Sequence, residues 1–174
     1  LIPSNMALIM SDSVKLSIEH ISRTVSAFPS AIVSSFPDLG NAGFVDIEKM
    51  GGARLPLGAL VGRSRVFEVD LNGITANALQ LGQGTPQAFD FSAAVRVRYD
   101  AQGAGIRDTI KAQALREQLV IIKALNASNW PSVAGLVTLV ARSGTIQSGA
   151  AVDDAGQEYE FILSEVQVDL SVDM

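Results

Sequence analysis

The sequence predicts an α+β fold: one mainly antiparallel or mixed β-sheet with two principal helices packed on one of its faces. Residues 12–27 and 106–127 repeat apolar side chains at helical spacing. Residues 89–100 instead alternate apolar and polar side chains without a break, which is the period of a half-buried strand. Together with shorter alternating segments on either side, these give the expected element order α-β-β-α-β-β.

Length and composition indicate one domain with a surplus of apolar residues. The chain has 174 residues, and we expect a short N-terminal extension over residues 1–10 and a single α+β domain over residues 11–174. Hydrophobic residues make up 48% of the chain and charged residues only 18%, whereas a typical soluble domain has roughly 25% charged residues. This surplus predicts that part of the surface is buried against further copies of the chain.

The first helix is predicted by a single apolar stripe. Ser11 can cap its N-terminus, and Asp12 is favourable in the first turn because of the helix dipole. Pro29 ends the pattern because it lacks a backbone N–H. The helix should therefore cover about residues 12–27. The stripe consists of Val14, Ile18, Ile21, Val25 and Phe28.

The next segment is rich in Gly and Pro. Residues 29–62 predict turns with one or two short extended pieces. Residues 64–71 then alternate apolar and polar side chains and predict a strand. Since Asn72-Gly73 is a strong hairpin-turn dipeptide, we expect the strand to end there and residues 74–88 to form an exposed loop or a flexible arm.

The second helix, over residues 106–127, carries two apolar clusters. One is the stripe expected to face the sheet, and the other consists of Leu115, Leu119 and Ile122. An apolar arc this wide exceeds what one sheet face requires. We therefore take these three residues, or else the sheet face turned away from the helices, as candidate contacts with a neighbouring subunit. The sheet-facing stripe consists of Ile106, Ile110, Ala114, Ile121, Ala124 and Leu125.

Two closing strands are expected near residues 135–144 and 158–172, joined by a turn-rich segment that contains Asp153-Asp154-Ala155-Gly156. In the last strand the apolar positions are even-numbered from Val166 onward but odd-numbered over residues 159–163. Two explanations are open: a bulge shifts the phase, or both faces of the strand are covered at that point.

The composition disfavours most catalytic and metal chemistry. The 18 acidic and 13 basic residues give a net charge of −5, which disfavours general nucleic-acid binding. The sequence has no Cys and one His, His20, so it lacks the residues for a thiol nucleophile or a cluster of His and Cys ligands. Near pairs of carboxylates, such as Glu68 with Asp70 and Asp153 with Asp154, suit a solvated strand face or a turn. We therefore expect no enzyme activity, catalytic residue, cofactor or metal, and no segment that spans a membrane.

Arg96 and Arg98 project from one face of the strand over residues 89–100 and are further candidates for the subunit interface. No aromatic residues interleave with them as nucleobase stacking would require. We expect them to form cross-strand ion pairs, within one subunit or between neighbours. The expected partners are Glu68, Asp70, Glu165 and Asp169.

Most of residues 11–174 resemble the tail terminator family of long-tailed bacteriophages, which is typified by the lambda minor tail protein U. The similar features are the amphipathic N-terminal helix, the strand FDFSAAVRVRYD, the helix IRDTIKAQALREQLVIIKAL, and two closing strands around the turn DDAG. The resemblance implies a ring, expected to be a homohexamer, that caps the tail tube, ends its polymerisation and provides the surface to which the head or neck docks.

The same resemblance implies the partners and the location. They are the tail tube protein and a neck, stopper or connector protein, with DNA passing through the lumen without specific binding. The location is the tail–neck region of the virion, after assembly in the host cytoplasm. The loop after the first strand is the candidate contact with tube or neck, ordering on contact. Its candidate residues are Asn77, Leu79, Gln80, Leu81 and Gln83.

Two alternative functions remain open at this point. One is a head-side neck or stopper protein that connects head and tail. The other is a small soluble enzyme with an unrecognised pocket.

Overall fold

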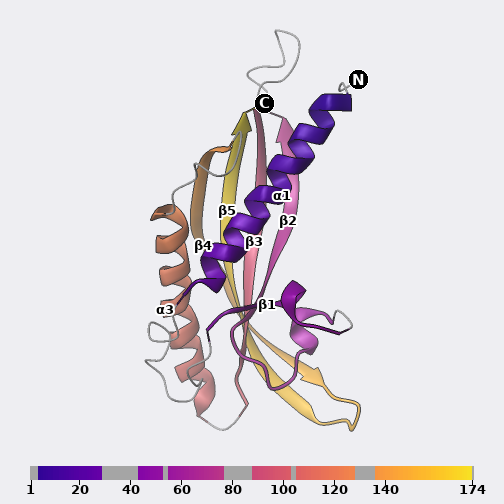
Figure 1. Ribbon diagram of the computed structural model, residues 1–174. Helices are drawn as coiled ribbons and strands as arrows, with labels where there is room; N and C mark the ends of the chain where they lie inside the picture. Colours follow the sequence, from indigo (N-terminus) through magenta and orange to yellow (C-terminus); the bar gives the residue numbers. More distant parts are fainter. Residues whose placement is uncertain are drawn as a thin grey trace.

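The computed structural model describes residues 4–28, 43–52, 55–76, 88–102, 105–127 and 136–173. It has an α+β architecture with a mixed five-stranded sheet and two long helices (Figure 1). Helix α1 crosses the sheet diagonally, and α3 runs along the side of β4 (Figure 1). The bounds of the long elements are α1 Ser4–Ser26, β2 Val66–Ala76, β3 Ala88–Asp100, α3 Ile106–Ala127, β4 Leu136–Val152 and β5 Glu158–Asp173.

The strand order in the sheet is β1-β2-β3-β5-β4. The short strand β1 (Val45–Asp46) pairs in parallel with β2, and every other neighbouring pair is antiparallel. The six long elements follow one another as α-β-β-α-β-β, and the structure adds β1 at one edge, which the expected order lacked. Two 3-10 helices, η2 (Ile47–Lys49) and η3 (Leu57–Ala59), lie between β1 and β2 in the sequence.

One face of the sheet forms the core together with both long helices. Ile21 and Val25 of α1 and Ile110 and Ile121 of α3 belong to the same buried cluster as Val95 of β3. Because side chains alternate along a strand, the even-numbered positions of β3 face the other way. We call that opposite side of the sheet the outer face. The sheet residues buried in the core cluster are Phe67, Phe91, Ala93, Val95, Val97, Tyr99, Ala141, Ile162, Val166, Val168 and Leu170.

The first helix begins earlier than predicted. It starts at Ser4, so residues 4–10, which the sequence suggested as an extension, belong to α1. Residues 6–10 are Met, Ala, Leu, Ile and Met, of which Ala, Leu and Met favour helix strongly, and no Pro or Gly breaks the segment. The capping signal at Ser11 was therefore overridden by the helix propensity of the residues before it. The predicted start at residue 12 was wrong.

Two predicted strand ends were also wrong. Strand β2 continues through Asn72 to Ala76, with a shift of register between Leu71 and Gly73, so the Asn-Gly dipeptide forms a bulge rather than a turn. Strand β4 runs on past Gly144 to Val152, with a second shift between Ser143 and Ile146. In both cases the neighbouring strand is long enough to continue the ladder of hydrogen bonds, and one extra residue is absorbed as a bulge.

The change of apolar phase in β5 arises because both of its faces are covered. Its register with β3 is continuous from Asp173 to Phe161, so no bulge intervenes in that pairing. Ile162 faces the core, whereas Phe161 is buried on the outer face. Cβ atoms added at Gly58 of η3 and Gly149 of β4 would lie 3.1 and 2.5 Å from the Phe161 ring. The 3-10 segment therefore covers this end of the outer face.

Gly149→Ala is expected to lower the free energy of unfolding by about 1–3 kcal/mol, because the new methyl group would overlap the Phe161 ring. Gly73→Ala is the matched control, since a Cβ there would meet nothing within 4 Å. Both substitutions restrict the unfolded chain to a similar extent, so their difference isolates the steric effect. Urea unfolding of both variants measures it, and equal stabilities would contradict the packing described.

Candidate functional site

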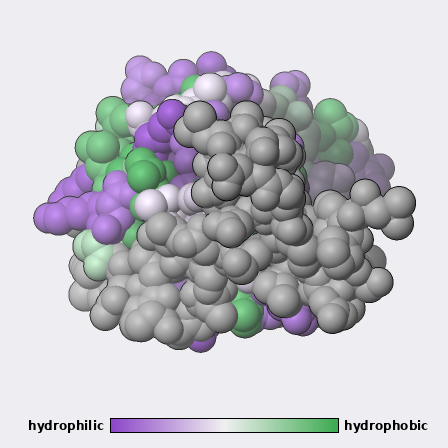
Figure 2. Space-filling view, turned by 90° about the horizontal axis from the view of Figure 1, so that it is seen from above, coloured by the Kyte–Doolittle hydropathy of each residue, from purple (hydrophilic) through white to green (hydrophobic). Residues whose placement is uncertain are grey.

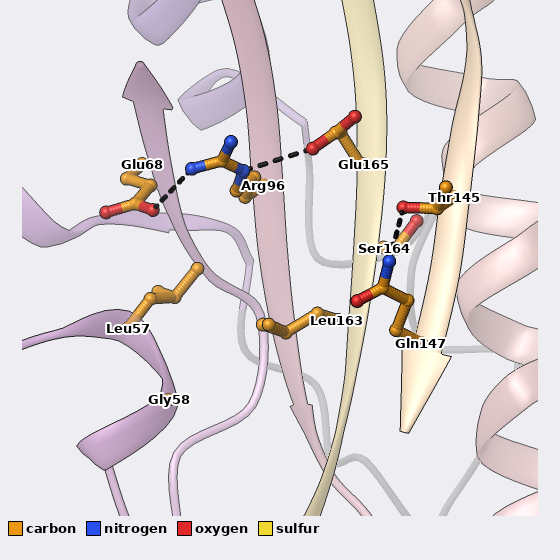
Figure 3. A pocket seen from close by; sticks show the side chains of 9 residues that line it. All are labelled: Leu57, Gly58, Glu68, Arg96, Thr145, Gln147, Leu163, Ser164 and Glu165. Atoms are coloured by element: carbon orange, nitrogen blue, oxygen red, sulfur yellow. Dashed lines mark hydrogen bonds and ion pairs between the residues drawn. The ribbon is translucent and has the colours of Figure 1, made fainter. Parts of the chain in front are cut away.

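The outer face carries a pocket of about 390 Å³ where η3 meets the sheet (Figure 3). Arg96 lines it and lies between Glu68 of β2 and Glu165 of β5 (Figure 3). Leu57 and Leu163 supply an apolar side. The remaining lining residues are Gly58, Thr145, Gln147 and Ser164.

Arg96 joins three strands by ion pairs, as the sequence predicted for it. Its Nη1 lies 3.0 Å from Asp70 Oδ2 and 3.7 Å from Glu68 Oε1, and its Nε lies 3.1 Å from Glu165 Oε2. The hydrogen bond to Glu165 is the main cause that raises the pKa of Arg96. These pairs are partly exposed, so they contribute little to stability individually. Their importance lies in the charge that they leave on the surface.

The outer face is predominantly acidic. Arg96 is outnumbered by the carboxylates around it, and Arg142 pairs with Asp169 at 2.7 Å. Asp90 shares this face, since it lines a shallow hollow together with Asp169. The carboxylates on it include Glu68, Asp70, Asp90, Glu165 and Asp169, and its accessible guanidinium groups include Arg96 and Arg142.

Arg98 does not fit the predicted subunit interface. Although its parity on β3 is that of Arg96, it is fully buried within its own chain. Its Nη1 donates to the carbonyl oxygen of Arg63, and its guanidinium lies over the Phe161 ring at 5.0 Å from the centroid. Burial lowers the pKa of Arg98, and Asp100 partly opposes this shift. The Phe161 ring and the backbone at Arg63 cover Arg98, and strand alternation alone does not reveal this packing.

The predicted second cluster on α3 is divided by the structure. Leu115 and Leu119 are exposed, with 50% and 57% of their surface accessible. Ile122 instead is half-buried and packs against the core cluster, so it does not share the exposure of the two leucines. Figure 2 shows hydrophobic residues among hydrophilic ones on the left side of the molecule, the side on which α3 lies in Figure 1.

The core-facing side of α3 contains a buried ion pair that the sequence analysis missed. Arg65 Nε and Nη2 lie 3.0 and 2.8 Å from Glu117 Oε1, with side chains only 1% and 3% exposed. Gln113 donates to the same carboxylate. Burial and the neighbouring Glu117 raise the pKa of Tyr99 well above its ordinary value. The available signal was that Gln113 and Glu117 fall on the same helical arc as Ile110 and Ile121.

The other predicted positions lie in a hydrogen-bonded turn or fall outside the described residues. Asp153 accepts hydrogen bonds from the backbone N–H groups of Ala155 and Gln157, both at 2.9 Å, in the β4–β5 turn.

The described residues contain no group of three or more His, Asp or Glu side chains placed to hold a metal ion. No helix in the described ranges is long and apolar enough to cross a membrane. The candidate tube- or neck-contact residues Asn77, Leu79, Gln80, Leu81 and Gln83 lie outside the described residues.

His20 makes the stability depend on pH near neutrality. It is half-buried on α1, and burial together with Arg23 lowers its pKa below the ordinary value of 6.5. The unfolded chain therefore binds this proton at a higher pH than the folded chain, so the folded state should lose stability as the pH falls below about 6.5.

His20 is the only histidine, so its ring-proton resonance reports this titration without overlap. The midpoint should lie below 6.5 in the folded protein and rise in urea. The stability of the wild type relative to His20→Gln should fall between pH 7 and pH 5. A folded midpoint at or above 6.5 would contradict the prediction.

The chain matches no protein-family model, and no curated protein is recognisably similar to it in sequence.

Proposed function

We propose that this protein is a ring-forming structural protein of the tail terminator type, which caps the tail tube of a long-tailed bacteriophage and ends its polymerisation. The observation that carries the proposal is the pair of exposed leucines on α3, Leu115 and Leu119. They lie one turn apart on a helix whose other side already fills the core. Large apolar side chains grouped in this way on a surface are typical of a contact with another protein.

The arrangement of elements also supports the proposal. Both long helices contribute to one core cluster with a single sheet face, as the α-β-β-α-β-β order of the resemblance implies. The opposite face is left partly open, so the subunit offers two different surfaces. Different surfaces on one subunit permit head-to-tail contacts, and such contacts close into a ring when the rotation between neighbours allows it.

The edge strand β4 is a further reason to expect assembly. It is 17 residues long and contains one charged residue, Arg142. It also exposes Val140 and Val152. Long edge strands with few charges tend to pair with other chains unless they are covered. In the proposed ring, neighbouring subunits or the tube would cover this edge.

The proposed partners are the tail tube protein on one side of the ring and a neck, stopper or connector protein on the other, in the tail–neck region of the virion. DNA would pass through the lumen. A net charge of −5 suits a channel that DNA must leave without adhering, since phosphate binding requires clustered basic residues.

The test is to add the purified protein to the tail tube protein of the same virus while that protein polymerises. Negative-stain microscopy should show annular particles alone and capped tubes in the mixture, with growth arrested in proportion to the rings added. Unchanged tube lengths would contradict the terminator function. Rings that bind the head-side vertex protein but not tube ends would identify a neck or stopper protein instead.

A further inference from the structure

The exposed side of α3 is both apolar and basic. Leu115 and Leu119 are flanked by Arg116 and Lys123, which are exposed and make no ion pair with another described residue. These four residues share one side of the helix because residues three and four apart are neighbours on its surface. The only exposed acidic residue of α3 is Asp108 in its first turn. We call this side the leucine face.

The outer face of the sheet has the complementary character. Three carboxylates, those of Glu68, Asp70 and Glu165, surround the single guanidinium of Arg96 and leave a surplus of negative charge. Apolar side chains lie on the same face: Leu163 lines the pocket with Glu68 and Glu165, and Val140, which is 54% exposed, pairs with Asp169 in the sheet. The outer face therefore offers apolar contacts bordered by carboxylates, where the leucine face offers leucines bordered by cations.

We propose that the leucine face of one copy docks on the outer face of the next copy, and that this contact builds the ring. The inference rests on the function proposed above. It commits to a second copy of the chain as the occupant because the two complementary surfaces belong to the same polypeptide. In this contact Arg116 and Lys123 meet the surplus carboxylates, and the leucines cover the apolar positions of the sheet.

The dimensions and placement of the two surfaces agree with this contact. A helix of 22 residues is about 33 Å long, and four strands span roughly 15–20 Å, so the helix is long enough to cross all four long strands of the sheet. The core side of α3 packs against the sheet face opposite the outer face. One subunit can therefore present its leucine face to one neighbour and its outer face to another. Such a heterologous contact propagates, and closure sets the copy number.

Leu119→Asp tests the leucine face. It should weaken association by about 30-fold or more, because it places a carboxylate against an acidic surface at the centre of the contact. Lys15→Asp is the matched control, since it introduces the same residue at an exposed position of the other long helix. Thermal unfolding should show both variants folded as the wild type. Light scattering should show the wild-type mass for Lys15→Asp and monomer for Leu119→Asp.

A mixing experiment tests whether the two surfaces bind each other. Asp70→Lys damages only the outer face, where the Asp70 side chain is 54% exposed, and should also be monomeric alone. An equimolar mixture with Leu119→Asp, at about 100 µM each, retains one intact leucine face and one intact outer face per pair. It should give particles of at least two subunits, whereas each variant alone stays monomeric.

The outcomes separate this inference from the proposed function. A mixture that stays monomeric, or a Leu119→Asp variant that assembles as the wild type does, would overturn the proposed contact. If wild-type rings still cap tubes in that case, the terminator function stands with another interface. If the paired dimers form but wild-type assemblies do not arrest tubes, the contact stands and the terminator function fails.

Discussion

Glu117→Gln is expected to lower the free energy of unfolding by about 3–5 kcal/mol. The Glu117 carboxylate is the buried partner of the Arg65 guanidinium, at 2.8 Å from Nη2 and 3.0 Å from Nε. A neutral amide of nearly the same shape would leave a positive charge in the core without its counter-charge. The loss should therefore far exceed that of an ordinary surface substitution, which lies within about 0.5 kcal/mol.

Urea unfolding measures this loss, and Glu19→Gln on the exposed side of α1 is the matched control for the same chemical change. The double variant Arg65→Met with Glu117→Met should be less destabilised than either Arg65→Met or Glu117→Met alone, because it removes both charges together. If the double variant loses the sum of the two single losses, the pair is not coupled and the explanation fails.

Phe161→Ala should cost about 3–5 kcal/mol, with a local effect on the segment around η3. Phe161 is 8% exposed and is packed against Gly58, Gly149 and the Arg98 guanidinium. Removing the ring leaves a cavity and takes away the surface on which a buried cation rests. The 3-10 segment then loses the ring that packs against Gly58.

Hydrogen exchange tests the local part of this prediction. The amides of Ala59 and Leu60 donate to Pro56 and Leu57 carbonyl oxygens, and both should exchange faster in Phe161→Ala. Tyr159→Ala is the matched control: it removes an aromatic ring two residues away on the same strand, where the side chain is only half-buried. A loss below 1 kcal/mol for Phe161→Ala, or exchange unchanged at these amides, would contradict the anchoring role.

Local periodicity in the sequence was sufficient to determine the main elements. The alternation over residues 89–100 predicted β3 to within one residue, and the helical spacing over residues 106–127 predicted α3 at both ends. The cross-strand ion pairs of Arg96 were also predicted, since even-numbered residues of β3 must face carboxylates on the neighbouring strands. These features depend on the periodicity of each element and on the elements next to it, and both can be read directly from the sequence.

Only the tertiary structure decided which polar residues are buried and where strands end. Arg96 and Arg98 have the same parity, yet Arg98 is fully buried beside the Phe161 ring, whereas the Arg96 side chain stays 35% exposed. Asn72-Gly73 has the composition of a turn but forms a bulge, because β3 offers hydrogen-bond partners beyond it. Glu117 can occupy the core only because Arg65, 52 residues earlier, reaches it from another part of the fold. Burial and pairing between distant segments depend on how the elements pack, and no local pattern in the sequence carries that information.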